Sequence, residues 1–348
     1  FTGALGGGSD NFGFGTNVGN ALTTGRQNTI IGAYAGDAIT TGYYNTLLGY
    51  DAGGAITTGR WNTIIGADAG DAITSGASNV ALGSAWTLSS LTTGSSNVAI
   101  GSNTARNMTT ANYNIGIGAS ALKACTTGGS NVAIGFIALT DLTTGSSNVS
   151  FGIGSGQNIT TGRNNVINGA YAASNMTTGR DNVAIGYNAA KTDASNANVT
   201  YARYGVYIGY DAHPLNSSSQ NEIVIGYDAD GNGSDSITLG NSNISSFGCY
   251  ADLENPSDER LKKNIKGLPY GLEEVKKMNA VEYDMKVDDR HDIGFIAQEL
   301  EKIIPDVVSK GSDDMLSIKY AKLVPVLVNA IKDLSDEVES LKEKLNGI

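Results

Sequence analysis

The sequence predicts a mainly β repeat protein, a parallel β-roll or β-solenoid, followed by an α+β domain that ends in a long helix. Glycine and asparagine recur along the first two thirds of the chain at intervals of 17 residues. Each interval carries one short β-branched stretch, as expected for one strand per turn of a solenoid. Of the 23 Lys and Arg residues, 15 lie beyond residue 256, together with 19 of the 34 Asp and Glu residues. The chain therefore divides into a sparsely charged repeat and a charged C-terminal domain.

The repeat is defined by a glycine and by an asparagine four residues before it. The step of 17 residues is broken once by a step of 18, and a Thr-Thr-Gly sequence or a near copy separates consecutive units. Degenerate units end at Gly209, Gly226 and Gly240. The regular glycines are Gly15, Gly32, Gly49, Gly66, Gly83, Gly101, Gly118, Gly135, Gly152, Gly169 and Gly186, and the asparagines run from Asn11 to Asn182.

Apolar columns within the repeat predict where its core lies. Residues three before and one before each glycine are mostly apolar, as in Val80 and Leu82, and this alternation predicts a short strand that buries this face. Small residues three after the glycine (Ala35) and larger ones seven after it (Ile39) predict further buried columns. One unit cannot enclose a core alone, so neighbouring units must stack. About 14 turns at a strand spacing of about 4.8 Å would extend over about 65 Å.

Composition excludes several classes of protein. A net charge of −11 disfavours binding to nucleic acid or to an anionic membrane surface. No apolar run approaches the roughly 20 residues that span a bilayer, so we expect no membrane insertion. Cys125 and Cys249 define neither a disulfide framework nor a metal site. A charged and then apolar leader is not recognisable at Phe1, so we expect a targeting segment to be absent or removed.

The repeat resembles the heads of trimeric autotransporter adhesins. The resemblance rests on segments such as Asn79–Gly83, Asn97–Gly101, Asn131–Gly135 and Asn182–Gly186, and it covers about residues 10–240. In that family each chain coils into a left-handed parallel β-roll, and three rolls pack around an axis. The period of this chain is longer, because Thr-Thr-Gly lengthens the turn. The resemblance implies a trimeric β-roll, with its handedness known only by analogy.

The C-terminal domain resembles the intramolecular chaperone domain of phage endosialidases and tail fibres, the S74 peptidase family. The matching motifs are Ser257–Ile265, Gly294–Leu300, Pro305 and Tyr320 ahead of the last helix. Members of this family drive trimer assembly and then cut themselves off with a serine–lysine dyad.

Carried over by position, the resemblance makes Ser257 the nucleophile, Lys262 the general base and Pro256–Ser257 the bond that is cut. A serine hydroxyl needs a base, and a lysine serves when burial or like charge lowers its pKa. Asp258 and Arg260 are candidate supporting residues. The alternative is that Ser257 only caps a helix and that Lys262 is a solvated surface lysine. Pro256 also constrains the backbone at the bond that is cut.

Apolar residues spaced by three and four in the last helix predict a coiled-coil seam that would hold three chains in register. Packing of the first turns (Val324–Ile331) on their own domain is the alternative. The seam residues are Val324, Leu327, Ile331, Leu334, Val338, Leu341, Leu345 and Ile348.

Two further groups of residues are candidate binding sites. Asp228, Asp230 and Asn232 match the first half of a calcium loop, but position 12 is Leu239, so a turn is favoured and no cofactor is predicted. Tyr43, Tyr44, Arg60 and Trp61 follow Thr-Thr-Gly in successive units and should stack on one surface. Such a surface suits sugar rings or a protein receptor, whereas ordinary packing of turn aromatics is the alternative.

One residue interrupts an apolar column. Asn168 stands where neighbouring units have isoleucine. Three copies on a trimer axis would bind water or an ion, or set the register. A locally rotated strand with Ile167 inward is an equal alternative.

We therefore predict a distal phage tail-fibre or receptor-binding fragment, located in the virion and facing the host surface. Residues 1–190 form the repeats, residues 191–256 the degenerate repeats and connector, and residues 257–348 the self-cleaving chaperone with a coiled coil at 324–348. The predicted partners are two further copies, a host polysaccharide or surface protein, and upstream tail-fibre or virion proteins. A tailspike depolymerase acting on host polysaccharide and a bacterial trimeric surface adhesin are the alternatives.

Overall fold

The computed structural model describes residues 8–84, 86–250, 254–286, 289–311 and 315–346. Its contacts divide the chain into two compact units, Phe1–Asn241 and Ser242–Ile348. No helix among these described residues is long and apolar enough to cross a membrane.

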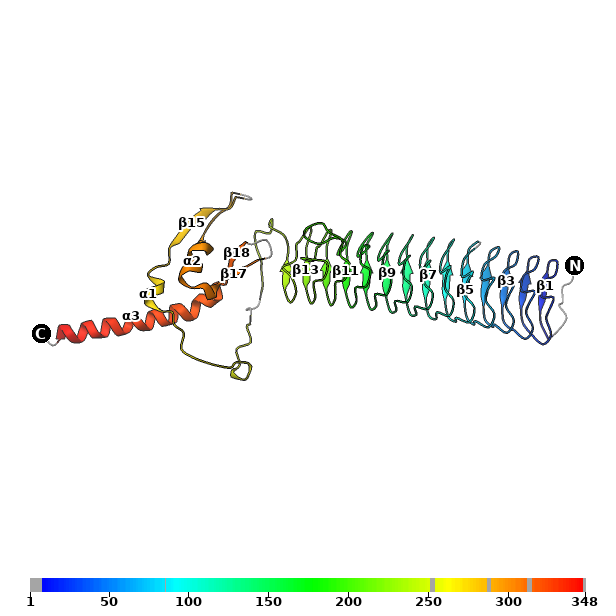
Figure 1. The fold of residues 1–348 in the computed structure, drawn as a ribbon, viewed down its shortest axis with the longest axis horizontal. Helices are drawn as coiled ribbons and strands as arrows, with labels where there is room; N and C mark the ends of the chain where they lie inside the picture. The colour runs from blue at the N-terminus through cyan, green and yellow to red at the C-terminus, as the bar shows by residue number, and fades with distance from the viewer. Residues whose placement is uncertain (1–7, 85, 251–253, 287–288, 312–314, 347–348) are drawn as a thin grey trace. The chain divides into compact units, whose positions relative to one another are not determined.

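The first unit is a parallel β-solenoid with one three-residue strand per turn (Figure 1). The residues described in this unit form 14 strands, each paired with its neighbours in the sequence, and the register places equivalent residues of the repeat side by side, as in Val80 beside Val98. The predicted fold class and 17-residue repeat are thus confirmed. The strands are β1 (Phe12–Phe14), β2 (Thr29–Ile31), β3 (Thr46–Leu48), β4 (Thr63–Ile65), β5 (Val80–Leu82), β6 (Val98–Ile100), β7 (Ile115–Ile117), β8 (Val132–Ile134), β9 (Val149–Phe151), β10 (Val166–Asn168), β11 (Val183–Ile185), β12 (Val206–Ile208), β13 (Ile223–Ile225) and β14 (Ile237–Leu239).

In β1–β13 the buried face of the strand is the opposite of the predicted one. The middle residue of the strand, such as Ile64 or Ala81, points into the solenoid and is fully buried, whereas Val80 and Leu82 face outward. The solenoid is filled instead by these middle residues and by the two columns after the glycine, represented by Ala35 and Ile39, which are buried as predicted. We call the first and third residues of β1–β14 the outer strand face.

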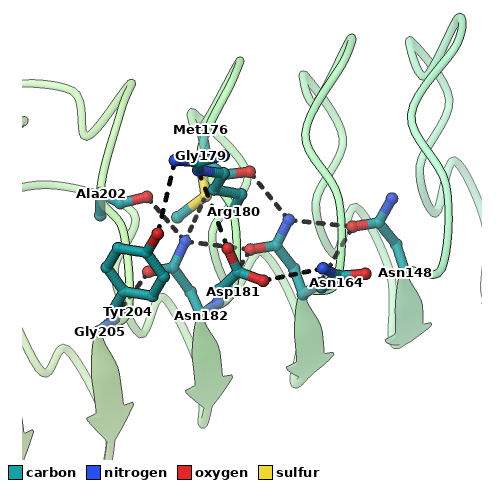
Figure 2. Close-up of polar contacts among 11 residues, drawn as sticks. Asn148, Asn164, Met176, Gly179, Arg180, Asp181, Asn182, Ala202, Tyr204 and Gly205 are labelled. Atoms are coloured by element: carbon teal, nitrogen blue, oxygen red, sulfur yellow. Dashed lines mark hydrogen bonds and ion pairs between the residues drawn. The ribbon is translucent and has the colours of Figure 1, made fainter. Parts of the chain in front are cut away.

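A ladder of buried asparagines runs along the inside of the solenoid (Figure 2). In each step the side-chain oxygen of one asparagine accepts from the backbone N–H and the side-chain amide of the next, as between Asn148 and Asn165 at 3.2 and 2.9 Å. The same amide also donates to a backbone carbonyl of the following turn, which is Gly179 in the case of Asn165 and an alanine in two other steps. We call Asn11 to Asn182 the asparagine ladder. Its last oxygen accepts from the backbone of Gly205.

Glycine is required where the chain leaves each strand. Gly49 has a φ of +143°, and a Cβ there would lie 2.5 Å from the carbonyl oxygen of Gly66 in the next turn. The regular glycine column therefore allows adjacent turns to approach within strand-pairing distance.

The second unit is a small α+β fold. Two antiparallel hairpins, β15–β16 and β17–β18, accompany short helices and a final helix of 24 residues (Figure 1). Leu300, Ile304, Val307, Leu323 and Val326 form its core. The elements are η1 (Glu259–Leu261), α1 (Leu272–Val275), β15 (Ala280–Asp284), β16 (His291–Phe295), α2 (Ala297–Ile303), η2 (Pro305–Val307), β17 (Val308–Lys310), β18 (Leu316–Ile318), η3 (Tyr320–Lys322) and α3 (Leu323–Asn346).

Candidate functional site

Ser257 and Lys262, five residues apart, are in direct contact. The short helix η1 lies between them and turns the chain back, so that Lys262 begins a new extended segment directly after it. The Lys262 ammonium donates a hydrogen bond to Ser257 Oγ at 2.6 Å. Both residues are exposed, as is Pro256 immediately before them. The structure thus brings together the predicted nucleophile and base, while burial, one of the expected ways to activate the lysine, is not found in the single chain.

Asp258 and Arg260 hold the turn between the two residues of this dyad. Asp258 accepts from the Arg260 backbone N–H at 2.8 Å, which caps η1, and from the guanidinium at 3.0 and 2.7 Å. The Arg260 side-chain and backbone hydrogen bonds lower the pKa of Asp258, and the Asp258 carboxylate raises the pKa of Arg260. Asp258 therefore stays ionised and Arg260 paired, and neither touches the Ser257 hydroxyl.

The aromatic candidates of the second to fourth turns form one cluster. The rings of Tyr43 and Trp61 meet edge to face at 5.6 Å, and those of Tyr44 and Trp61 stack at 6.4 Å. The guanidinium of Arg60 lies 5.0 Å from the Trp61 ring centroid, and that of Arg26 lies 5.5 Å from the Tyr43 centroid. The ring faces in this cluster are thus largely covered by the other rings and by the arginines, while Tyr44 and Trp61 remain about half exposed.

The calcium candidates do not converge on a metal site. Asp230 instead pairs with His213, with 3.1 Å between its carboxylate oxygen and the ring nitrogen Nδ1. Among the described residues no three His, Cys, Asp or Glu side chains lie close enough together to hold a metal ion.

Two apolar surfaces stand out in the single chain. The outer strand face exposes large side chains along the solenoid, including Leu48, Leu82 and Phe151. In the second unit, Leu323, Val326 and Ala330 bury one side of α3, whereas the predicted seam from Val324 to Leu345 is exposed by 40–76%. Ile348, the last seam residue, lies outside the described residues.

Sequence reasoning noticed the asparagine column but missed its role, and it missed two features near the end of the solenoid. Tyr187, Tyr210 and Tyr227 stack on one another at 5.3 Å in the column after the glycine, which their 17-residue spacing from 210 to 227 signals. Glu222 is fully buried in the column of the asparagine ladder and accepts from the backbone N–H groups of Leu215 and Gly233.

Comparison with known proteins bears on the second unit. Residues 257–309 match the family model Peptidase_S74, described as the chaperone of endosialidase. This confirms the predicted resemblance for the domain that begins at the Ser257–Lys262 dyad.

Curated relatives include phage tail fibre proteins. The long tail fiber protein Gp37 of Enterobacteria phage Ox2 is 37% identical over 105 residues, which cover 27% of this chain and 42% of that protein. Gp37 of Enterobacteria phage M1 is 37% identical over 108 residues, covering 28% and 43%. A probable tail fiber protein of Escherichia phage Phieco32 is 35% identical over 118 residues, covering 31% and 16%. The chain spans less than half the length of these relatives and is similar to tail fibre proteins, which are parts of the virion.

Proposed function

We propose, on the premise that the chain carries a chaperone-of-endosialidase domain in a context similar to phage tail fibres, that it is a homotrimeric tail-fibre segment of the virion. Its C-terminal domain assembles three copies and then releases itself by cutting the Pro256–Ser257 bond. The observation that carries this proposal is the 2.6 Å contact between Lys262 Nζ and Ser257 Oγ, at the start of the matched domain.

The dyad can perform the cut with its own groups. Unprotonated Lys262 takes the Ser257 hydroxyl proton, and Oγ attacks the carbonyl carbon of Pro256. The new C–O bond replaces the C–N bond, and the freed Ser257 amine takes the proton back from Lys262. Water then hydrolyses the ester, leaving a carboxylate on Pro256 and the original hydroxyl on Ser257. Asp258 and Arg260 support the reaction by fixing the turn that places the lysine.

Assembly is supported by the two exposed apolar surfaces. The strands are spaced by about 4.8 Å, and each strand is three residues long at about 3.3 Å per residue. The 14 strands therefore give the outer strand face an area of about 600 Å². Monomeric proteins rarely expose contiguous apolar patches above a few hundred Å². The seam of α3 adds a coiled-coil surface of the kind that joins parallel helices.

Binding to the host surface is the least direct part of the proposal. The cluster of Tyr43, Tyr44, Arg60 and Trp61 supports a contact with a receptor of sugar or protein character through its exposed edges and the arginines. Upstream partners in the virion follow from the similarity to tail fibre proteins alone.

Expression of the full chain tests the cleavage. We expect denaturing gels and intact mass to show fragments 1–256 and 257–348. Ser257→Ala and Lys262→Ala should remain full-length, while Lys263→Ala, at the adjacent exposed lysine, should cut normally. A wild-type chain that stays whole, or a Lys262→Ala chain that cuts at the wild-type rate, would refute the dyad.

Assembly is tested separately in the uncut Ser257→Ala chain. Its mass in solution should correspond to three copies. Leu334→Asp, on the exposed seam of α3, should reduce the proportion of trimer, whereas Ser335→Asp, at the next residue, should not. A monomeric Ser257→Ala chain would refute the assembly proposal and leave the cleavage proposal standing.

A further inference from the structure

Asn168 is the one polar residue in the third position of β1–β14. The other third residues are Phe14, Ile31, Leu48, Ile65, Leu82, Ile100, Ile117, Ile134, Phe151, Ile185, Ile208, Ile225 and Leu239. Asn168 is exposed on the outer strand face, and it pairs with Phe151 of the preceding turn and Ile185 of the following one. Ile167 points inward, as the middle residue does in the other turns, so the strand is not locally rotated.

A face made of similar apolar turns does little by itself to define how two copies align. Sliding one copy along the other by one turn, about 4.8 Å, again places mostly β-branched or other apolar residues on apolar residues. Repeating apolar contacts distinguish such registers poorly, and in coiled coils a single buried asparagine is what specifies the register. The threonines in the first position of β2–β4 discriminate little, because a threonine hydroxyl can bond to nearby backbone.

We propose that Asn168 sets the register in which copies of this chain associate through the outer strand face. The inference rests on the proposed self-association. With copies aligned, the Asn168 amides lie at one level and can donate to and accept from one another. After a slip of one turn, each amide is buried against Phe151 or Ile185 of a neighbour and loses these partners, which is costly.

The occupant of this face is a second copy because of its length and its period. An identical solenoid is the partner whose side-chain rows repeat at the same spacing along all 14 strands. The face of about 600 Å² approaches the roughly 800 Å² per partner of a stable protein interface. The third-position column, which is large and apolar apart from Asn168, is placed at the axis of the assembly, where equivalent residues meet.

Disulfide cross-linking in the uncut chain can measure the register. In a Ser257→Ala, Cys249→Ser background, a cysteine at Ile31 or at Ile225 reports whether equivalent third residues of two copies meet near either end of the solenoid. With Asn168 present we expect both cysteines to cross-link efficiently. Asn168→Ile should reduce the yield at both positions, because a slip of one turn displaces equivalent residues equally at both ends, and loss of one amide level corresponds to about a tenfold change in the ratio of aligned to slipped assemblies.

A relocated asparagine separates register from stability. The double variant Asn168→Ile, Ile185→Asn moves the polar level by one turn, and it should restore the yield at both positions. Equal yields with and without Asn168, or no rescue by the relocated asparagine, would overturn the inference. Trimers that never cross-link at either cysteine would also overturn it, because the column would not lie at the axis. A monomeric chain would instead refute the proposed assembly.

Discussion

Replacing Asn131 in the middle of the asparagine ladder should open the solenoid locally. Its amide donates to Asn114 Oδ1 at 3.0 Å and to the Gly145 carbonyl at 3.0 Å. Its oxygen accepts from the backbone and side-chain nitrogens of Asn148, both at 3.0 Å. Asn131→Ala removes these four hydrogen bonds without admitting a new partner.

The size of the destabilisation depends on which polar groups lose every hydrogen-bond partner when Asn131 is replaced. The Asn148 side chain keeps its bond to Gly162, and Asn114 Oδ1 keeps the backbone N–H of residue 131. The Gly145 carbonyl and the Asn148 backbone N–H are left unpaired inside the solenoid. At about 1–3 kcal/mol for each such group, the free energy of local opening should fall by about 2–6 kcal/mol.

Hydrogen exchange measures this opening directly. In peptides covering residues 126–150, we expect amide protection to fall between about 30-fold and about 20,000-fold. Asn107→Ala, at an exposed asparagine, is the matched control and should change protection little. A loss at residue 131 of less than about threefold would show that the ladder is not an energetic element and that the reasoning is wrong.

Two further predictions concern charged groups. Burial, and then the charges of Asp37, Asp68 and Asp71, raise the pKa of Asp51, so its ionisation costs folding stability as the pH rises through that raised pKa. Asp51→Asn should therefore raise the thermal midpoint at pH 7 more than at pH 3, and an equal gain at both would contradict this origin. Asp258→Asn weakens the hydrogen bonds from Arg260 that hold η1. It should therefore slow self-cleavage by about tenfold to 100-fold with an unchanged pH profile. A wild-type rate of cleavage would show that Asp258 does not position the dyad.

The architecture could be predicted because the same strand and glycine pattern recurs every 17 residues along the chain. Short strands at a nearly constant spacing are compatible with few folds other than a stack of turns. Gly49 and its equivalents mark where each turn approaches the next turn of the solenoid. Among the calcium candidates, Asp230 lies 3.1 Å from the His213 ring nitrogen, a contact that sequence spacing alone does not reveal. Turn residues of this kind are common without any bound ion.

The orientation of the strands could not be predicted from alternation alone. Val80 and Leu82 look like a core pair because large apolar residues are usually buried. In the structure both face outward, and the interior takes the middle residue of the strand, whether that residue is small, as Ala81, or large, as Ile64. Sequence alternation identifies which residues share a face, whereas the course of the chain after each strand decides which face is the interior.

For the Ser257–Lys262 dyad, the family resemblance predicted the pair, whereas the spacing of the two residues did not. Spacing alone does not tell whether Ser257 and Lys262 meet, because five residues in a strand would hold them apart. They meet because Asp258 caps η1 and reverses the chain between them. The family resemblance supplied this pair in advance, and the hydrogen-bonding chemistry of the Asp258 side chain accounts for it physically.

The outer strand face also gives a physical reason for the proposed assembly domain. The asparagine ladder and the inner columns satisfy each chain internally, so one copy can fold turn by turn. In the proposed trimer the outer strand face would contact the other copies, and its similar rows would let early contacts form in many registers. Trimerisation through α3 would bring three chains together at one end before the rows meet. A polar level at Asn168 would then select the aligned arrangement, and this selection would persist after the proposed cut has removed the domain that started it.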